Sequence, residues 1–176
     1  MDHVFVIGLG SNLGVREHNL SAAVEAVARL ALPLAVRLEA LSCVYESAAI
    51  GPPQPAYLNA ALRLSACCTP EALLEALHAI EAAHGRTREV HWGPRSLDLD
   101  ILWASEGRQT EQLTIPHAQL LLRTFALAPL LDVAPELAVH YAPVLERLGG
   151  PPPVRGTLRY DPTSGSCELA ASAQCG

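Results

Sequence analysis

Lysine is missing from this sequence: all 12 basic residues in the 176-residue chain are arginines. A chain without lysine cannot form a Schiff base with a substrate carbonyl, and it cannot build a lysine-dependent phosphate loop or the lysine–glutamate pair of protein kinases. Any phosphate that this protein binds must therefore be held by arginine, by backbone N–H groups or by a metal ion.

Long apolar runs and an excess of positive charge are also missing. Arginine, glutamate or proline interrupts the apolar stretches well before the roughly 18 residues that a transmembrane helix needs. The 12 basic and 18 acidic residues give a net charge of −6, which argues against binding of nucleic acid or anionic membrane. Half of the residues are hydrophobic and 17% are charged, so we expect one folded domain rather than a disordered chain.

Paired metal ligands of the zinc type are absent from the sequence. The five cysteines contain no CxxC pair and the seven histidines no HxxxH pair, so a zinc site is not expected. The first residues show no signal-peptide pattern, and we expect a reduced, cytoplasmic protein. We interpret Cys43, Cys67 and Cys68, which lie in apolar strand-like runs, as small core residues.

The hydrophobic pattern predicts elements in the order β-α-β-β-α-β, which is the order of a ferredoxin-like α+β sandwich with a mainly antiparallel sheet. Pro33 should end the first helix, and Thr69 should cap the second, which ends at Gly85. The expected strands are 4–9, 36–45, 58–66 (half-buried) and 97–103, the expected helices 16–31 and 70–84, and two further helical pieces are expected near 117–122 and 126–132.

Proline, glycine and serine dominate the end of the chain from Gly149 onward. We therefore predict a folded domain over residues 1–149 and a loosely ordered tail over residues 150–176. Removal of this tail is expected to leave activity intact.

Asp98 and Asp100 are the strongest candidates for chemistry. Residues i and i+2 of a strand point to one face, about 7 Å apart, and two carboxylates there repel each other unless a cation lies between them. Carboxylates are hard oxygen ligands that suit Mg²⁺ shared with a substrate phosphate. The alternative interpretation is an edge strand with a solvated acidic face.

The segment before these acids is rich in arginine. Arg86, Arg88 and Arg95 lie close together, with Trp92 and a Gly-Pro pair among them. Arginine binds phosphate through paired hydrogen bonds, and tryptophan offers a flat face for stacking, so the segment is a candidate lid over a nucleoside triphosphate. A surface network of ion pairs and a tryptophan that anchors the loop are the alternatives.

Weaker candidates lie elsewhere in the chain. Glu81 places a carboxylate on the apolar stripe of the second helix, where it either pairs with an arginine or supports a metal site. Tyr57 and Asn59 share one face of the third strand, and the Asn59 amide suits the edge of a heterocycle. The turn GLGSNLG lacks both the third glycine of a dinucleotide fingerprint and the ending of a phosphate loop, so we interpret it as a tight strand-to-helix turn.

A family resemblance is carried, from Val4 to about Pro135, by the segments GLGSNLGVR, YESAAIG, YLNAAL, AIEAAHGRTR, WGPRSLDLDIL and LTIPHAQLLLRTFALAPLLDVAPE. In this order they resemble the 6-hydroxymethyl-7,8-dihydropterin pyrophosphokinases of folate biosynthesis. The resemblance implies a ferredoxin-like fold and transfer of a pyrophosphoryl group from MgATP to the pterin hydroxymethyl oxygen, with release of AMP. It also implies two Mg²⁺ ions and small-molecule partners, and we expect a monomer.

The resemblance assigns roles by motif position. Asp98 and Asp100 would hold the metal ions, and with Arg86 and Arg95 they would form the catalytic set. The ATP site would comprise Glu81, Arg86, Arg88, Trp92, Arg95, Ile101, Thr114, His117 and Arg123. The pterin site would comprise Ser47, Ala49, Ile50, Tyr57, Asn59, Trp92, Asp98 and Phe125. No dedicated general base is assigned, and Asp98 is a candidate.

The sequence departs from the family pattern in four ways. The segment AAIG stands where Pro-x-Gly is usual, and Ala118 follows His117 where proline is common. Both flexible loops are about one residue shorter than in the family, and Glu89 adds an acid to the arginine-rich segment. We expect these differences to change affinity and leave the charged core intact. A two-metal nucleotidyl transferase or nuclease is the alternative enzyme, and a ferredoxin-like sensor or oligomerisation module is the non-enzymatic one.

Overall fold

The computed structural model describes residues 2–51, 53–85 and 95–171. The helices are α1 (Arg16–Ala28), α2 (Ala31–Leu34), α3 (Pro70–Ala83), α4 (Thr124–Val133) and α5 (Ala138–Arg147), with two 3₁₀ turns, η1 (Leu120–Leu122) and η2 (Pro135–Leu137). The strands are β1 (His3–Ser11), β2 (Arg37–Leu41), β3 (Cys43–Ser47), β4 (Tyr57–Ala66), β5 (Asp98–Ala104), β6 (Arg108–Gln109), β7 (Thr114–Ile115), β8 (Val154–Asp161) and β9 (Ser166–Ala170).

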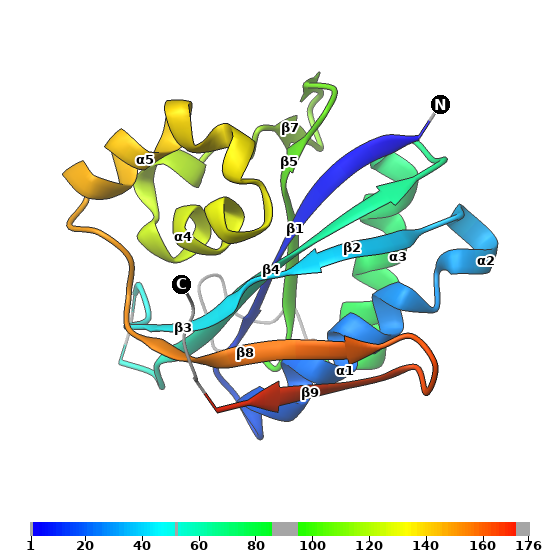
Figure 1. Ribbon diagram of the computed structural model, residues 1–176, viewed down its shortest axis with the longest axis horizontal. Helices are drawn as coiled ribbons and strands as arrows, with labels where there is room; N and C mark the ends of the chain where they lie inside the picture. Colours follow the sequence, from blue (N-terminus) through cyan, green and yellow to red (C-terminus); the bar gives the residue numbers. More distant parts are fainter. Residues whose placement is uncertain (1, 52, 86–94, 172–176) are drawn as a thin grey trace.

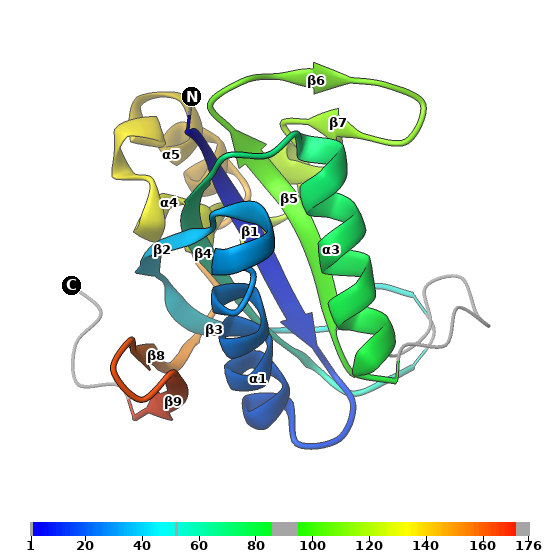
Figure 2. The same cartoon turned by 90° about the vertical axis from the view of Figure 1, so that its right-hand side faces the viewer.

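One sheet organises the described part of the chain (Figure 1). Its seven strands run in the order β5-β1-β4-β3-β8-β9, with β2 also paired to β4, and every pair is antiparallel. Helices α1 and α3 lie side by side on one face, whereas α4 and α5 lie on the other (Figure 2). The strand order and the chain order confirm the ferredoxin-like α+β fold.

Strand β4 lies at the centre of both cores. Leu62 and Leu64 pack beneath α1 and α3 in the larger cluster, and Ala61 belongs to a second cluster with Leu127 and Leu130 of α4. The prediction that this strand is half-buried is therefore wrong. The apolar residues of β4 alternate as expected, but the second face of the strand is also buried. Helix α4, which comes much later in the chain, covers it.

Two predicted boundaries also need correction. The strand expected over 36–45 is two strands, β2 and β3, interrupted at Ser42. Its N–H donates to the Ala61 carbonyl (2.9 Å) and its hydroxyl accepts the Ala61 N–H (2.7 Å), which bends the chain while both strands stay paired to β4. The first helix ends at Ala28, and Pro33 lies inside α2, whose first-turn N–H groups have no helical partner to lose.

The second helix begins and ends as predicted. The Thr69 hydroxyl accepts the Ala72 N–H (3.2 Å), Pro70 takes the first helical position, and Gly85 follows with a φ of 77°. Of the two later helical pieces, the first is the 3₁₀ turn η1, and the second is α4.

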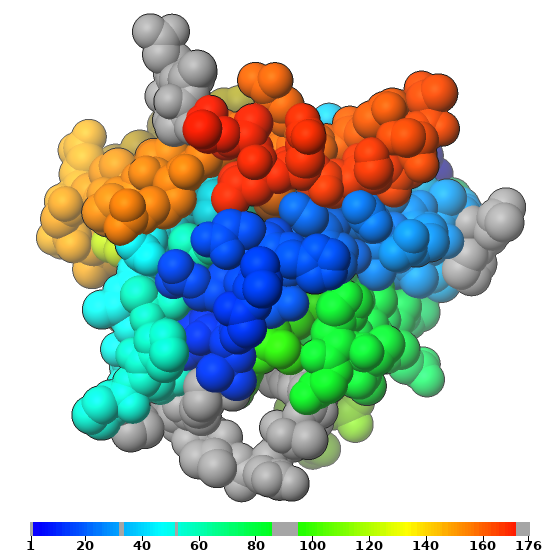
Figure 3. Space-filling view, turned by 90° about the horizontal axis from the view of Figure 1, so that it is seen from below, coloured from blue at the N-terminus to red at the C-terminus, as the bar shows by residue number. Residues whose placement is uncertain are grey.

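The prediction of a loosely ordered tail is wrong for most of its length. Strand β8 pairs with β3, and β9 pairs with β8. Leu158 is buried in the main core, and the Cys167 N–H donates to Glu25 of α1 (2.9 Å). Figure 3 shows this β8–β9 hairpin, in orange and red, lying along the blue surface of α1. The GGPPP run is only the connection to it.

The cysteines are less uniform than the sequence suggested. Cys43 is buried as predicted, but it is disulfide-bonded, which is uncommon in the reducing compartment expected from the sequence. Cys67 is exposed rather than in the core, because β4 ends at Ala66 and the next two residues form the turn before α3. None of the helices in the described ranges combines the length and the hydropathy that a membrane crossing needs.

Candidate active site

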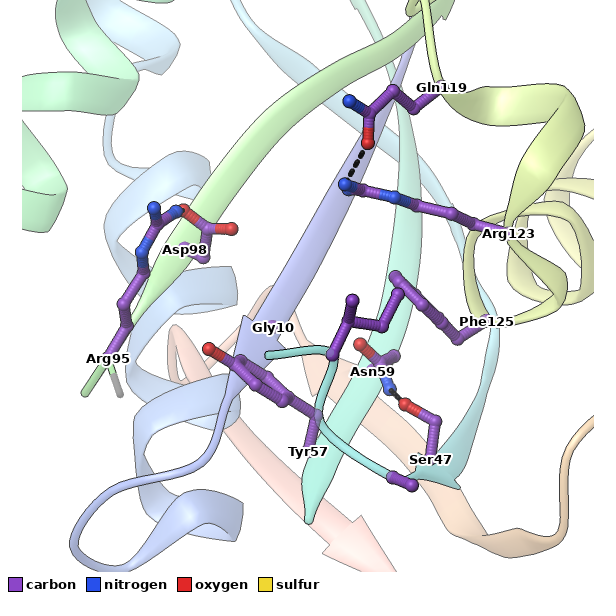
Figure 4. Close-up of a pocket in the computed structure, with 11 residues that line it drawn as sticks. Gly10, Ser47, Tyr57, Asn59, Arg95, Asp98, Gln119, Arg123 and Phe125 are labelled. Carbon is purple, nitrogen blue, oxygen red and sulfur yellow. Dashed lines mark hydrogen bonds and ion pairs between the residues drawn. The ribbon is translucent and has the colours of Figure 1, made fainter. Parts of the chain in front are cut away.

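A pocket of about 290 Å³ opens beside α4, on the part of the sheet face that this helix does not cover (Figure 4). Strands β1, β3, β4 and β5 supply its floor and sides, and the segment from η1 to the start of α4 forms the opposite wall. The described residues that line it are Gly10, Ser47, Ala48, Ile50, Tyr57, Asn59, Arg95, Asp98, Gln119, Arg123 and Phe125. The pocket therefore gathers most of the predicted residues that the structure describes.

Strand register explains why Asp98 and Asn59 face one pocket. Gly10 of β1 pairs with Asp98 on one side and with Asn59 on the other, so the three residues form one row across the sheet. Neighbouring strands lie about 4.8 Å apart, and residues in register project to the same face. A Cβ at Gly10 would lie 3.7 Å from both the Asp98 Cβ and the Tyr57 ring. The missing side chain therefore keeps the floor open between the acid and the amide.

Helix α4 is held against β3 by the carboxylate of Asp132. Oδ2 of Asp132 accepts the Cys43 N–H (3.0 Å) and the Tyr45 hydroxyl (2.9 Å) of β3. Burial raises the pKa of Asp132 and of Tyr45 above their usual values. Because Tyr45 pairs with Asn59, this contact fixes the position of α4 and of Phe125 relative to the pocket row.

The acidic side of the pocket combines the Asp98 carboxylate with the Arg95 guanidinium, and Asp100 lies on the same strand without lining the pocket. Asp98 and Asp100 project to the same face of β5, as predicted, and Nη1 of Arg95 donates to Oδ1 of Asp98 (2.5 Å). Burial is the largest single effect and acts to lower the pKa of Arg95. The charge and the hydrogen bond of Asp98, together with smaller contributions from Tyr57 and Asp100, outweigh it, and the net pKa is raised. Arg95 therefore stays protonated. This donor set fits a hard divalent cation bound together with phosphate.

The opposite side of the pocket suits a flat polar ring. Nδ2 of Asn59 donates to the Ser47 hydroxyl (3.0 Å), which fixes the orientation of the buried amide. Tyr57 and Phe125 add aromatic faces, and the Arg123 guanidinium lies 5.6 Å from the centre of the Phe125 ring while it donates to Gln119. An oriented amide between aromatic rings can read the edge of a heterocycle and stack on its faces.

Asn12 links two segments beside the pocket, a contact that the sequence analysis missed. It is buried, and it exchanges two hydrogen bonds with the backbone of Arg95: Asn12 N–H to the carbonyl (3.0 Å) and Arg95 N–H to Oδ1 (2.7 Å). Nδ2 of Asn12 donates to Oε1 of Gln54 (2.9 Å) and to the Pro55 carbonyl (3.1 Å). One side chain thus joins the segment before the acids to the loop before Tyr57. The sequence showed only an asparagine in a turn.

Glu81 and Ile101 lie on the other face of the sheet. Oε1 of Glu81 accepts the Leu99 N–H (2.7 Å), and both Glu81 and the Ile101 side chain are buried beneath the helices. The hydrogen bond to Leu99 fixes α3 to β5 between the two aspartates, and Arg86 and Arg88, which were considered as ion-pair partners of Glu81, lie outside the described residues. Neither the Glu81 nor the Ile101 side chain reaches the pocket, so an ATP-binding role for Ile101 could involve only its main chain.

Other predicted residues lie near the pocket without lining it. Ala49 is not among the lining residues, although its neighbours Ala48 and Ile50 are, and Thr114 lies in the β6–β7 hairpin. The His117 N–H donates to the Leu102 carbonyl (2.9 Å), which holds His117 beside β5. Its Nδ1 accepts the Gln119 N–H (3.2 Å), so a neutral ring carries its proton on Nε2. Three predicted residues, Arg86, Arg88 and Trp92, lie outside the described residues, as does Glu89.

Comparisons with known proteins agree with this geometry. The model of the 7,8-dihydro-6-hydroxymethylpterin-pyrophosphokinase family matches residues 6–135, so the match ends before α5 and the β8–β9 hairpin. Among solved structures, a protein described as HPPK-DHPS in complex with substrates has a similar fold, with a TM-score of 0.55 at 14% identity over 77% of this chain and 41% of that chain. At that identity the likeness concerns the fold alone.

Three relatives share the name 2-amino-4-hydroxy-6-hydroxymethyldihydropteridine pyrophosphokinase. The protein from Synechocystis sp. is 46% identical over 76% of this chain and 68% of its own length. The protein from Bacillus subtilis is 42% identical over 78% and 81%, and that from Methylorubrum extorquens is 42% identical over 81% and 89%, respectively. The chain belongs to the 7,8-dihydro-6-hydroxymethylpterin-pyrophosphokinase family.

Proposed function

We propose that this protein transfers a pyrophosphoryl group from ATP to 6-hydroxymethyl-7,8-dihydropterin in folate biosynthesis. The pterin hydroxyl oxygen forms a bond to the β-phosphorus, the bond between that phosphorus and the AMP oxygen breaks, and AMP leaves. Family membership supports this reaction. The observation that carries it is the row in which Asp98 and Asn59 flank Gly10. This row places a carboxylate suited to metal and phosphate at one side of the pocket and an amide suited to a heterocycle at the other.

Asp98 and Asp100 are the residues that would hold Mg²⁺. Within the described ranges no group of three or more His, Cys, Asp or Glu side chains could hold a metal. Mg²⁺ typically takes one or two protein carboxylates and completes its shell with phosphate and water, so the pair suffices. Two bound ions, as the family resemblance implies, would neutralise the charge that develops on the phosphates.

The remaining charges of the pocket position the phosphates. Arg95 lies against Asp98, and its guanidinium can turn from that carboxylate to a phosphate oxygen without losing a partner. Arg123, at the wall beside Phe125, supplies a second guanidinium, and His117 offers an N–H. Arg86 and Arg88 complete the proposed set from outside the described residues.

The pterin ring is held by shape and by one oriented amide. Asn59 faces its polar edge, Tyr57 and Phe125 contact its faces, and Ser47 and Ile50 close the side of the pocket. This placement aims the hydroxymethyl group toward Asp98. Transfer then depends on in-line positioning more than on a strong base, and Asp98 is the nearest described group that could accept the hydroxyl proton.

The protein is also proposed to act as a cytoplasmic monomer. ATP as the co-substrate favours the cytoplasm as the place of action. Light scattering during size-exclusion chromatography tests the monomer directly, and a dimer mass would contradict it.

The decisive assay mixes ATP, Mg²⁺ and the pterin alcohol with the protein and separates the nucleotides by chromatography. AMP and the pterin diphosphate should form in equal amounts, and both should be absent when the pterin is omitted or the metal is chelated. Release of ADP or of inorganic phosphate as the main product would contradict pyrophosphoryl transfer.

A further inference from the structure

Glu46 lies between two arginines at the end of β3. Oε2 of Glu46 accepts from Arg155 of β8, through Nε (2.7 Å) and Nη2, and Oε1 accepts from Nη1 of Arg16 (3.1 Å). The hydrogen bond from Arg155 is the main cause that holds the pKa of Glu46 below its usual value; burial opposes it and Arg16 assists. Both carboxylate oxygens are therefore occupied, and the side chain has one fixed orientation.

Arg16 connects this carboxylate, which lies before the loop beside the pocket, to the far end of that loop. Nη1 of Arg16 also donates to the Ala56 carbonyl (2.7 Å), directly before Tyr57. Glu46 itself directly precedes Ser47, the hydroxyl partner of Asn59. The residues that leave and re-enter the sheet around the loop 48–56 are thus joined through one carboxylate. Two pocket residues, Ser47 and Tyr57, directly follow these two points.

The third member of this chain of contacts comes from the C-terminal hairpin. Strand β8 is fixed in place by its pairing with β3 and by the Glu46 N–H, which donates to the Pro153 carbonyl (2.9 Å). Gly156 allows the close approach of β9, because a Cβ there would lie 2.5 Å from the Ala170 carbonyl oxygen. The hairpin lies beyond residues 6–135 that the family model matches, so this contact involves a part of the chain outside the matched region.

We propose that the β8–β9 hairpin positions the pterin side of the pocket through Arg155, Glu46 and Arg16, which makes Glu46 and Arg155 positioning residues for pterin binding. This inference rests on the proposed function, because it identifies which substrate the contact serves. The contact lies on the heterocycle side of the pocket and makes no hydrogen bond to Asp98, Arg95 or Arg123 among the bonds that the described residues form. Its loss should therefore weaken pterin binding and spare ATP.

The experiment compares Arg155→Ala with Arg159→Ala, a matched arginine on the same strand. Both side chains are exposed, but Arg159 lies four residues farther along β8, where its strand partner is Glu168 of β9. For Arg155→Ala we expect KM for the pterin to rise about two- to fivefold, which corresponds to the loss of one partly exposed ion pair. Its kcat and its KM for ATP should change less than twofold. Arg155→Lys, which keeps the charge, should restore part of the affinity.

A double-mutant cycle and a binding measurement complete the test. Glu46→Gln should raise the pterin KM as well, and Glu46→Gln with Arg155→Ala should be no worse than the more affected single variant. Fluorescence titration with the pterin should show the same ranking without turnover. Equal pterin KM values for Arg155→Ala and Arg159→Ala, or an equal loss in kcat and in both KM values, would overturn the inference. A wild-type protein that forms no AMP would instead refute the proposed function.

Discussion

The two faces of the sheet use the same strands for different purposes. On the face beneath α1 and α3, Ile7, Leu62 and Leu99 are all buried in one apolar cluster. On the other face, apolar residues continue only as far as α4 covers them, and beyond that point the row Asp98–Gly10–Asn59 lines the pocket. The residues that stabilise the fold and those that line the pocket are therefore on different faces of the sheet. On the second face they also occupy different parts of each strand.

The sharpest way to test this separation is to remove the acids of the pocket face. Asp98→Ala and Asp100→Ala should each lower kcat by about 10³-fold or more, because each change removes a ligand of the proposed metal site. The free energy of unfolding should hold or rise in Asp100→Ala, since two neighbouring carboxylates no longer repel each other, whereas in Asp98→Ala the lost ion pair with Arg95 offsets that gain. Product analysis measures the first effect and urea denaturation the second. Turnover at the wild-type rate in either variant would exclude the metal role.

The opposite result is expected on the helix-covered face. Leu62→Ala should lower the free energy of unfolding by about 2–5 kcal/mol, because it leaves a cavity in the main core. Well below the melting temperature its kcat and KM values should stay within about twofold of the wild type, because transition-state contacts on the other face are untouched. A variant that is stable but inactive would show that the two faces are not separable.

Asn12 joins the two sides of the pocket, and two substitutions distinguish its contacts. Asn12→Ala removes the side-chain hydrogen bonds to both segments and leaves the Arg95 N–H and the Pro55 carbonyl without this partner. The free energy of unfolding should therefore fall by about 1–3 kcal/mol, and both substrates should bind more weakly. Asn12→Asp keeps the acceptor for Arg95 and loses the donor to Gln54 and Pro55. It should impair pterin binding more than ATP binding, as steady-state kinetics would reveal. Equally weakened binding of both substrates in Asn12→Asp would show that the hydrogen bonds of Asn12 to Arg95 and to the loop before Tyr57 do not act independently.

The smallest expected effect concerns the pH dependence of stability. The pKa of Glu46 is held below its usual value of 4.5, mainly by Arg155, so its ionised form stabilises the fold above about pH 4.5 and this contribution is lost as the pH falls through the lowered pKa. Glu46→Gln should therefore be less stable at neutral pH and should lose less stability between pH 5 and pH 3. Denaturation curves across that range check the slope, and parallel slopes would contradict the ion pair.

Local signals in the sequence were sufficient for the elements that carry the acids. The cap at Thr69 and the alternation around Asp98 need only neighbouring residues, and both predictions were confirmed. Alternation also placed Ile101 on the face opposite the acids, and its side chain does lie there. The resemblance that assigned it to ATP could not say through which atoms. The burial of the second face of β4 depended on α4, which packs from more than 50 residues away in the sequence.

Contacts between distant segments account for what sequence reasoning missed. The hydrogen bonds of Asn12 span 42, 43 and 83 residues, and no local pattern encodes such partners. The hairpin was missed for a different reason: the proline and glycine before and between its strands dominated the composition, although the alternation V-R-G-T-L-R-Y was present in β8. Arg155 could not be found from the family motifs, because it lies outside every segment that carries the resemblance. Gln119 lies within one of those segments, but the resemblance assigned it no role.

The pairing of β4 has a consequence for how this fold can change. This strand is hydrogen-bonded to β1, β2 and β3, and it alternates leucines for the core with Tyr57 and Asn59 for the pocket. A single residue inserted within β4 would exchange its two faces, so that leucine would point toward the substrate pocket and asparagine into the hydrophobic core. Gains and losses of length should therefore be confined to the connecting loops, where they alter substrate preference without inverting the strand.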